Sequence, residues 1–425
     1  MAKISEENVH QHLYNQNLNK IIKEFPGLDC ASSDLVGGFD VEQPLVDAFE
    51  LSKIIKARAL EKLQRINRAI KNGVFIGSKI KLPTDNTTPM ELDMLGRHSG
   101  GLFILELKVE RSAERNAFSE LFAYSNYLAE MFALSGHKDI TNVLIARLEN
   151  KITRQAFLYD LLILDRDIVV YQPSFPDEEV KNLCLDIYIP TDDDFSQFAN
   201  DLISHDNISC VIASFHDEPG WFDSEEDGDG KLKYYTTDFL SGLATYAGQL
   251  MEKEHLHGFC FIRKPWKEKE LPYRNSLFVC AINPFVSVHE ARFNKISEQL
   301  EENYKDIFQS APMLGFRRRL INIADRAIKD CLCYGQRFEF EPEQPWSAIL
   351  SSASDVVQTH NFGFRITGIL REAYVGYLNW IYELDAHGVE VEDLSGVKVE
   401  VIQNWYQAWS FMFSRSKRQK CVIDE

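Results

Sequence analysis

The fold can be worked out from the stretch Glu91–Lys108, ELDMLGRHSGGLFILELK, in which two strand-like runs flank the pair Ser99-Gly100. A two-residue loop of this composition suits a tight hairpin turn, where glycine supplies the positive φ that such turns need. Centring the loop there places Asp93 opposite Glu106 and Glu91 opposite Lys108. Because side chains alternate along a strand, Glu106 and Lys108 project to the same side as Asp93. The sequence therefore predicts a β-hairpin that gathers carboxylates and a lysine on one face.

This cluster needs a cation. Acidic side chains beside Leu102 and Ile104 are costly to desolvate unless an opposite charge lies among them. Lys108 alone cannot neutralise three acids. Mg²⁺ or Mn²⁺ suits carboxylate oxygens best, so we expect a divalent metal ion at the hairpin.

The order of Asp93, then Glu106-Leu107-Lys108 at the end of an apolar strand, then a helix, resembles the core of the PD-(D/E)XK nuclease superfamily over roughly residues 44–172. The resemblance implies that Asp93, Glu106 and the main-chain carbonyl of Leu107 hold the metal. It also implies that Lys108 orients or activates the attacking water and steadies the charged transition state. The residue before the first acid is Leu92 rather than the proline of the motif, although Pro89 lies close by.

The neighbouring helices add three candidates. Glu120 and Tyr124 stand at i and i+4 and so share one helix face, where some branches of the superfamily carry Gln-x-x-x-Tyr; Glu120 takes the glutamine position. Tyr124 fits an apolar core stripe equally well. Related nucleases often have a metal-binding glutamate in the first helix, and Glu50 is preferred for it. Glu61, the other glutamate there, lies among basic residues and is more simply a solvated ion pair.

The apolar runs predict an α/β chain in four parts: a helical appendage over 1–43, a nuclease-like domain over 44–175, a second α/β domain over 176–285 and a mostly helical region over 286–425. Pro173 and Pro176 suggest the first boundary after the nuclease-like part, at residues 173–178. We expect that part to have a restriction-endonuclease-like fold, a mixed sheet flanked by helices. Its expected order is a helix over 44–72, a strand over 73–82, the hairpin, a helix over 112–136, a strand over 140–148, and a second hairpin over 161–171.

The net charge is −18, which argues against indiscriminate coating of nucleic acid. A nuclease would then need a local basic patch, and the first helix offers one that extends into the next strand. Its members are Lys53, Lys56, Arg58, Lys62, Arg65, Arg68, Lys71, Lys79 and Lys81. The plainer interpretation is a solvated helix face. The acidic balance elsewhere either repels nucleic acid from other surfaces or suits a protein partner.

The sequence contains no apolar run long enough for a membrane span and begins with a polar segment, so we expect no membrane partner. Eight cysteines are scattered without the spacing of a zinc site. A reducing cytoplasm is the simplest location for such a chain.

These observations favour a Mg²⁺- or Mn²⁺-dependent endonuclease, with DNA preferred over RNA on family grounds. The resemblance also implies a homodimer, and an antiviral defence or restriction-type effector is the leading biological hypothesis. A Glu-x-Lys on a strand is by itself more often a surface pair, so the competing class is a catalytically inactive nuclease fold that binds nucleic acid or assembles with other chains. A third alternative is a toxin-like enzyme that a protein partner or activator controls.

Overall fold

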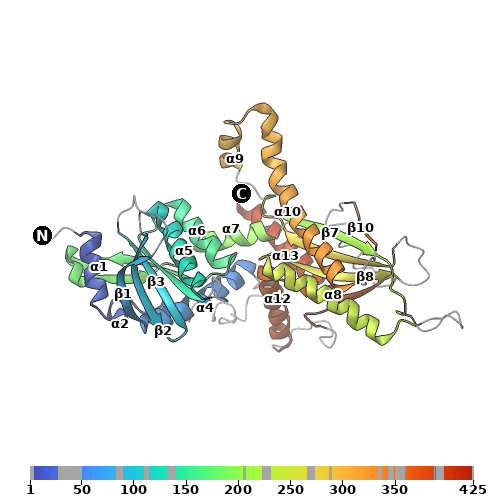
Figure 1. Ribbon diagram of the computed structural model, residues 1–425, viewed down its shortest axis with the longest axis horizontal. Helices are drawn as coiled ribbons and strands as arrows, with labels where there is room; N and C mark the ends of the chain where they lie inside the picture. The colour runs from blue at the N-terminus through green and yellow to red at the C-terminus, as the bar shows by residue number, and fades with distance from the viewer. Residues whose placement is uncertain are drawn as a thin grey trace. The chain divides into compact units, whose positions relative to one another are not determined.

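The computed structural model describes residues 4–26, 50–82, 90–109, 114–132, 139–203, 207–222, 231–265, 273–286, 290–332, 337–342, 349, 359–386, 388 and 397–423 (Figure 1). The chain divides into two compact units, Met1–Asp40 with Ile55–Phe195 and Val41–Ile54 with Ser196–Glu425. One unit contains a six-stranded sheet and the other a five-stranded sheet. The chain is therefore mixed α/β, as the sequence predicts.

The first unit is a mixed sheet flanked by helices. Its strand order is β1-β2-β3-β4-β5-β6, in which β3, β4 and β5 run parallel and the other neighbours antiparallel. The elements in chain order are α1 (Glu6–Tyr14), α2 (Leu18–Ile21), α4 (Leu51–Lys71), β1 (Val74–Leu82), β2 (Met90–His98), β3 (Gly101–Lys108), α5 (Glu114–Glu130), β4 (Ile140–Ala146), α6 (Lys151–Leu162), β5 (Ile168–Ser174), the short turns η3 (Pro176–Glu178) and η4 (Val180–Asn182), β6 (Cys184–Ile187) and the start of α7 (Asp192–Leu202). The part of the first helix expected over 44–49 lies outside the described residues.

The hairpin register confirms the prediction. His98 pairs with Gly101 across the Ser99-Gly100 turn, and the ladder continues to Met94 opposite Leu105, next to Asp93. Gly96 pairs with Phe103 across the hairpin. The ring of Phe103 fills the space that a side chain at Gly96 would need, since a Cβ there would lie 2.1 Å from the ring. Every residue of β4 is buried, as expected for a central parallel strand covered on both faces.

The prediction of a second hairpin over 161–171 is wrong. The structure has α6 up to Leu162, and β5 then starts at Ile168 and runs parallel to β4. Parallel neighbours need a crossover connection, which α6 supplies. Its buried Phe157 and Leu161 are four residues apart, which is the spacing of one helix face.

The first sheet also continues past the boundary expected at 173–178. The strand Cys184–Ile187, which we expected in the second α/β domain, pairs with β5 as β6. The two prolines mark a local turn, since η3 begins at Pro176, but the chain returns to the same sheet after it.

The second unit is built on an antiparallel sheet with the order β10-β7-β9-β8-β11. Its elements are β7 (Ile208–Phe215), α8 (Tyr234–Lys253), β8 (Gly258–Pro265), β9 (Asn275–Ile282), α9 (Glu290–Ser297), α10 (Glu302–Cys331), β10 (Phe338–Phe340), β11 (Thr359–Ile366), α12 (Gly368–Ala386) and α13 (Ile402–Ile423). Residues of α8 and α10 pack on one face in a single apolar core. On the other face, the ring of Phe259 lies 5.7 Å from that of Trp405 in α13.

The region expected to be mostly helical after residue 286 therefore contributes two strands, β10 and β11, to the sheet that residues 207–286 begin. Trp405 and Trp409 are fully buried, so these two indole rings pack in the core of the second unit. Within the described ranges, no helix combines the length and the apolar character that crossing a membrane requires.

Candidate active site

Three elements of the first unit bring the predicted residues together. Asp93 comes from β2, Glu106 and Lys108 from β3, and Glu120 from α5. The Lys108 ammonium lies 2.6 Å from Glu106 Oε1 and 2.8 Å from Glu120 Oε2. Asp93 Oδ2 accepts a hydrogen bond from the main-chain N–H of Leu107 at 2.9 Å. The structure thus places one ammonium between two carboxylates and ties the third carboxylate to the same strand.

Glu106 is the most buried of these acids, with 2 % of the residue exposed. Burial, with the negative charge of Asp93 as the next cause, raises the pKa of Glu106 to about 8. Its Oε2 atom is buried and has no hydrogen-bond partner. A buried carboxyl oxygen without a partner costs free energy, which a cation or a hydrogen-bond donor beside it would reduce.

The pKa values of Asp93 and Lys108, which lie beside Glu106, are raised as well. Burial also raises the pKa of Asp93, against the opposing effects of the Leu107 N–H and of Lys108. Burial alone would lower the pKa of Lys108, but its hydrogen bonds to Glu106 and Glu120 outweigh that effect and the pKa is raised. Lys108 therefore stays charged, and the acids compete for one positive group.

Tyr124 belongs to the same neighbourhood. It is 9 % exposed on α5, and burial, followed by the charges of Glu106 and Glu120, raises the pKa of its hydroxyl to about 12. A phenol with so high a pKa stays protonated at neutral pH. Tyr124 can donate a hydrogen bond in this site but cannot serve as a base.

The residues present fit a divalent ion of the magnesium class. In the described ranges, no group of three or more His, Cys, Asp or Glu side chains is arranged to hold a metal ion by itself. Mg²⁺, however, is usually bound by one or two carboxylates, with water and substrate phosphate completing its shell. Asp93 and Glu106, the latter through its unpartnered Oε2, would supply these two carboxylates.

The structure gives Glu50 a different environment. Glu50 directly precedes α4, its carboxylate lies 3.3 Å from the ammonium of Lys53 in the first turn of that helix, and both side chains are exposed by more than a third. Glu50 falls in the second compact unit, whereas Asp93 and Glu106 fall in the first. Its role as a further metal ligand stays a prediction.

Sequence reasoning missed the contribution of α1, which was expected to be an appendage. The ring nitrogen Nε2 of His10 lies 3.1 Å from the main-chain oxygen of Asp93 and 3.4 Å from Ser78 Oγ. His10 is 5 % exposed. Glu7, one turn earlier, pairs with Lys79 of β1. The apolar spacing of Val9 and Leu13 indicates that α1 packs on something, but no local signal points to a strand 83 residues away.

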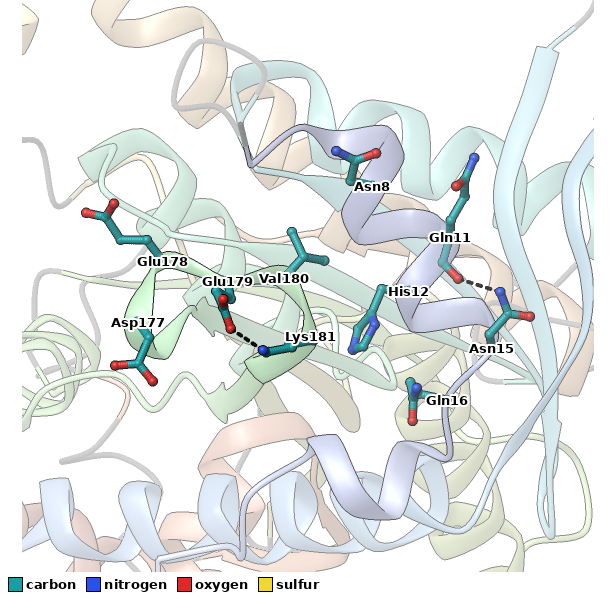
Figure 2. Close-up of a pocket in the computed structure, with 10 residues that line it drawn as sticks. All are labelled: Asn8, Gln11, His12, Asn15, Gln16, Asp177, Glu178, Glu179, Val180 and Lys181. Atoms are coloured by element: carbon teal, nitrogen blue, oxygen red, sulfur yellow. Dashed lines mark hydrogen bonds and ion pairs between the residues drawn. The ribbon is translucent and has the colours of Figure 1, made fainter. Parts of the chain in front are cut away.

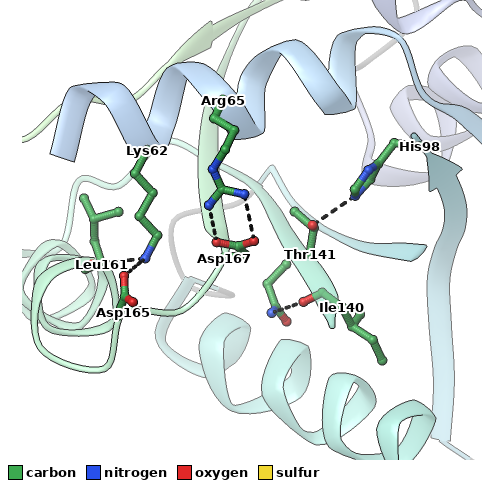
Figure 3. Close-up of polar contacts among 9 residues, drawn as sticks. Lys62, Arg65, His98, Ile140, Thr141, Leu161, Asp165 and Asp167 are labelled. Carbon is green, nitrogen blue, oxygen red and sulfur yellow. Dashed lines mark hydrogen bonds and ion pairs between the residues drawn. The ribbon is translucent and has the colours of Figure 1, made fainter. Parts of the chain in front are cut away.

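The basic patch of the first helix is largely neutralised within the chain. Figure 3 shows two examples, Lys62 with Asp165 at 2.8 Å and Arg65 with Asp167 at 2.8 Å. The other pairs are Lys53–Glu50, Lys56–Asp192, Arg58–Glu61, Lys71–Glu24 and Lys79–Glu7. In the part of the chain that the structure describes, Arg68 and Lys81 are the members without an ion pair. Most of the basic patch is therefore paired with acids, several of them from other segments, and its role in binding nucleic acid stays a prediction.

Figure 2 shows a second feature of this unit, a polar groove of about 670 Å³ between α1 and the turns η3 and η4. Amide side chains and His12 of α1 line one side. Asp177, Glu178, Glu179 and Lys181 line the other, and Lys181 is paired with Glu179 at 2.7 Å. These four charged side chains are exposed, and none of the candidate metal-binding residues lines the groove.

Comparison of the chain with known protein families, with curated proteins and with solved structures finds no match. The assignment of this site therefore depends on its residues and their geometry.

Proposed function

We propose that this chain is a metal-dependent nuclease of the PD-(D/E)XK kind, which hydrolyses phosphodiester bonds with Mg²⁺ or Mn²⁺. The observation that carries the proposal is the buried oxygen Glu106 Oε2, which has no partner although a lysine and a second acid lie beside it. Asp93 and Glu106 would hold the ion, with the carbonyl of Leu107 as a further ligand. A bound ion would polarise the phosphoryl oxygen and lower the pKa of a water molecule.

Lys108 and Glu120 would supply the charge stabilisation and the positioning that the reaction also needs. Lys108 keeps its proton and so can steady negative charge that develops on the phosphoryl oxygens. Glu120 holds the ammonium of Lys108 from the helix side at 2.8 Å and so sets its position. An ion bound at Glu106 would weaken the pairing of Glu106 with Lys108, and Lys108 could then face a phosphate or a water.

DNA is the preferred substrate on grounds of the resemblance, and the role as a restriction-type or antiviral effector in the cytoplasm rests on the resemblance as well. The neutralised basic patch does not exclude nucleic acid, because exposed ion pairs contribute only about 0–1 kcal/mol each and a phosphate can replace the acid. Arg68 and Lys81 are the first candidates for such contacts.

A non-catalytic module is the second candidate. Lys108 bridges Glu106 and Glu120, and a purely structural ion-pair network has the same arrangement. Such networks also perturb pKa values without any role in catalysis. The two candidates differ in whether Glu106 Oε2 receives an ion.

The deciding experiment measures cleavage of linear duplex DNA, circular duplex DNA, single-stranded DNA and RNA, with Mg²⁺ or Mn²⁺ against EDTA. Wild type is compared with Glu106→Gln, and Glu61→Gln on the exposed face of α4 is the matched control. We expect metal-dependent cleavage that falls by about 10²-fold or more in Glu106→Gln and is unchanged in the control. If wild-type protein that binds Mn²⁺ cuts none of these substrates, the nuclease proposal fails and the binding module is favoured.

A further inference from the structure

The first half of α10 projects from the core of the second unit (Figure 1). The helix spans 30 residues, and its buried residues begin only at Phe316. Before that point, the ring of Phe308 stacks on Phe293 of α9 with centroids 5.0 Å apart. This half of α10 therefore forms a helical hairpin with α9, while the second half packs on the sheet.

The projecting half carries an apolar stripe. Tyr304, Ile307, Ala311 and Leu314 follow one another at spacings of three, four and three residues, which places them on one helix face and matches the a and d positions of a coiled coil. The three large side chains are 53 %, 54 % and 62 % exposed. Five residues turn a regular α-helix by about 500°, which would place Phe316 about 140° away from Ala311. Pro312 lies between them and removes one main-chain hydrogen bond of the helix. The stripe is thus turned away from the face that packs on the core.

The charges at the two ends of the stripe identify what covers it. Glu301 stands at one end, and Arg317-Arg318-Arg319 follow the other. If two copies of α10 pair antiparallel about a two-fold axis with Tyr304 opposite Leu314, then Ile307 lies opposite Ala311 and Glu301 lies near the exposed Arg318. A parallel pairing would instead set like charges against each other.

We propose that the α10 stripe is a self-association surface, which binds the same stripe of a second copy of this chain in antiparallel orientation. Two helices that meet over about four turns bury less than the roughly 1,200 Å² of a standard interface. The dimer is therefore a weak one, with a dissociation constant on the order of micromolar. The proposal rests on the second unit alone and does not depend on the nuclease activity proposed for the first.

Sedimentation velocity of the full chain over about 1–100 µM tests the surface. Wild type should shift from monomer to dimer within this range, and Leu314→Lys should stay monomeric, without loss of folding because the side chain is exposed. Ile152→Lys is the matched control, since Ile152 is 73 % exposed on α6 of the first unit and should leave association unchanged. The proposal is overturned if the wild type stays monomeric or if the Leu314→Lys variant still dimerises. A monomeric wild type would mean that another partner covers the stripe.

Charge reversal tests the antiparallel orientation. Glu301→Arg and Arg318→Glu should each weaken the dimer about tenfold, because each sets like charges together at both ends of a symmetric contact. The double variant Glu301→Arg with Arg318→Glu should recover the wild-type dissociation constant. If the two single effects add in the double variant, the two residues do not face each other and the antiparallel pairing is wrong.

Discussion

Asp93 Oδ2 accepts a hydrogen bond from the main-chain N–H of Leu107 at 2.9 Å. Leu107 is the residue between Glu106 and Lys108, so this bond ties the acid of β2 to the middle of the motif on β3. The bond fixes one carboxylate oxygen of Asp93. It also keeps the negative charge of Asp93 close to Glu106, and this charge contributes to the raised pKa of Glu106. The same contact that orders the site thus keeps two acids together.

The first prediction concerns pH and Glu106. The folded chain keeps the proton of this carboxyl up to about pH 8, whereas the unfolded chain releases it near its ordinary pKa of 4.5. Its contribution to stability is therefore complete below pH 4.5 and is lost as the pH rises to about 8. In EDTA, we expect Glu106→Gln to gain about 2–4 kcal/mol in unfolding free energy relative to wild type between pH 5 and pH 8. Urea denaturation at several pH values checks this, and parallel pH profiles would contradict it.

The second prediction concerns Lys108. Replacing it by methionine leaves Glu106 and Glu120 without their ammonium, so we expect the variant to lose about 1–3 kcal/mol of stability at pH 8 in EDTA and to recover part of it when Mn²⁺ is added. Cleavage should be lost with the ion present. Lys253→Met is the control, because Lys253 is an exposed lysine in the last turn of α8, outside the site and the basic patch, and should change neither quantity. Equal cleavage by wild type and Lys108→Met would remove Lys108 from the mechanism.

The third prediction concerns the contact between α1 and the site. His10→Ala removes the bond to the main-chain oxygen of Asp93, and we expect it to cost about 1–3 kcal/mol of stability and to weaken Mn²⁺ binding severalfold. His12→Ala, two residues along the same helix and more exposed, should stay within about 0.5 kcal/mol of wild type. Calorimetry with Mn²⁺ at pH 8 measures the affinity. An unchanged affinity in His10→Ala would mean that α1 stabilises the sheet without positioning Asp93.

The fourth prediction concerns a buried ion pair in the second unit. Lys264 is 4 % exposed, pairs with Asp217 and lies 3.1 Å from Asn275 Oδ1. Asp217→Ala strands this ammonium in the core, so we expect a loss of about 3–5 kcal/mol. The double variant with Lys264→Met should recover most of it, because no buried charge is then left unpaired. Additive losses in the double variant would contradict this account.

The fifth prediction concerns the hairpin. Gly96→Ala places a Cβ 2.1 Å from the ring of Phe103 and should destabilise the chain by about 1–3 kcal/mol. Gly242→Ala is the comparison, since Gly242 lies within α8 with nothing inside 4 Å of the added Cβ. That change should stabilise the chain by about 0.5–1 kcal/mol. Thermal unfolding of both variants distinguishes a crowded glycine from a free one.

Two features of the first unit were missed for different reasons. The run Leu161–Leu164 is apolar throughout, and such a run does not distinguish a strand from the end of a buried helix, so α6 was missed. The pairing of the basic patch with acids was missed because several of these acids, such as Asp165 and Asp167, lie about a hundred residues away. A charge pattern within one helix contains no information about acids from other segments.

The sequence by itself determined the hairpin, its register and the grouping of Asp93, Glu106 and Lys108 on one face, because turn chemistry and the two-residue period of a strand act over a few neighbouring residues. The helix period likewise placed Glu120 and Tyr124 on one side of α5. Only the tertiary structure decided how deeply Glu106 is buried, which oxygen lacks a partner, that His10 bonds to the strand of Asp93 and that β6 joins the first sheet. These features depend on contacts between segments far apart in the chain, and the packing of the whole unit sets them.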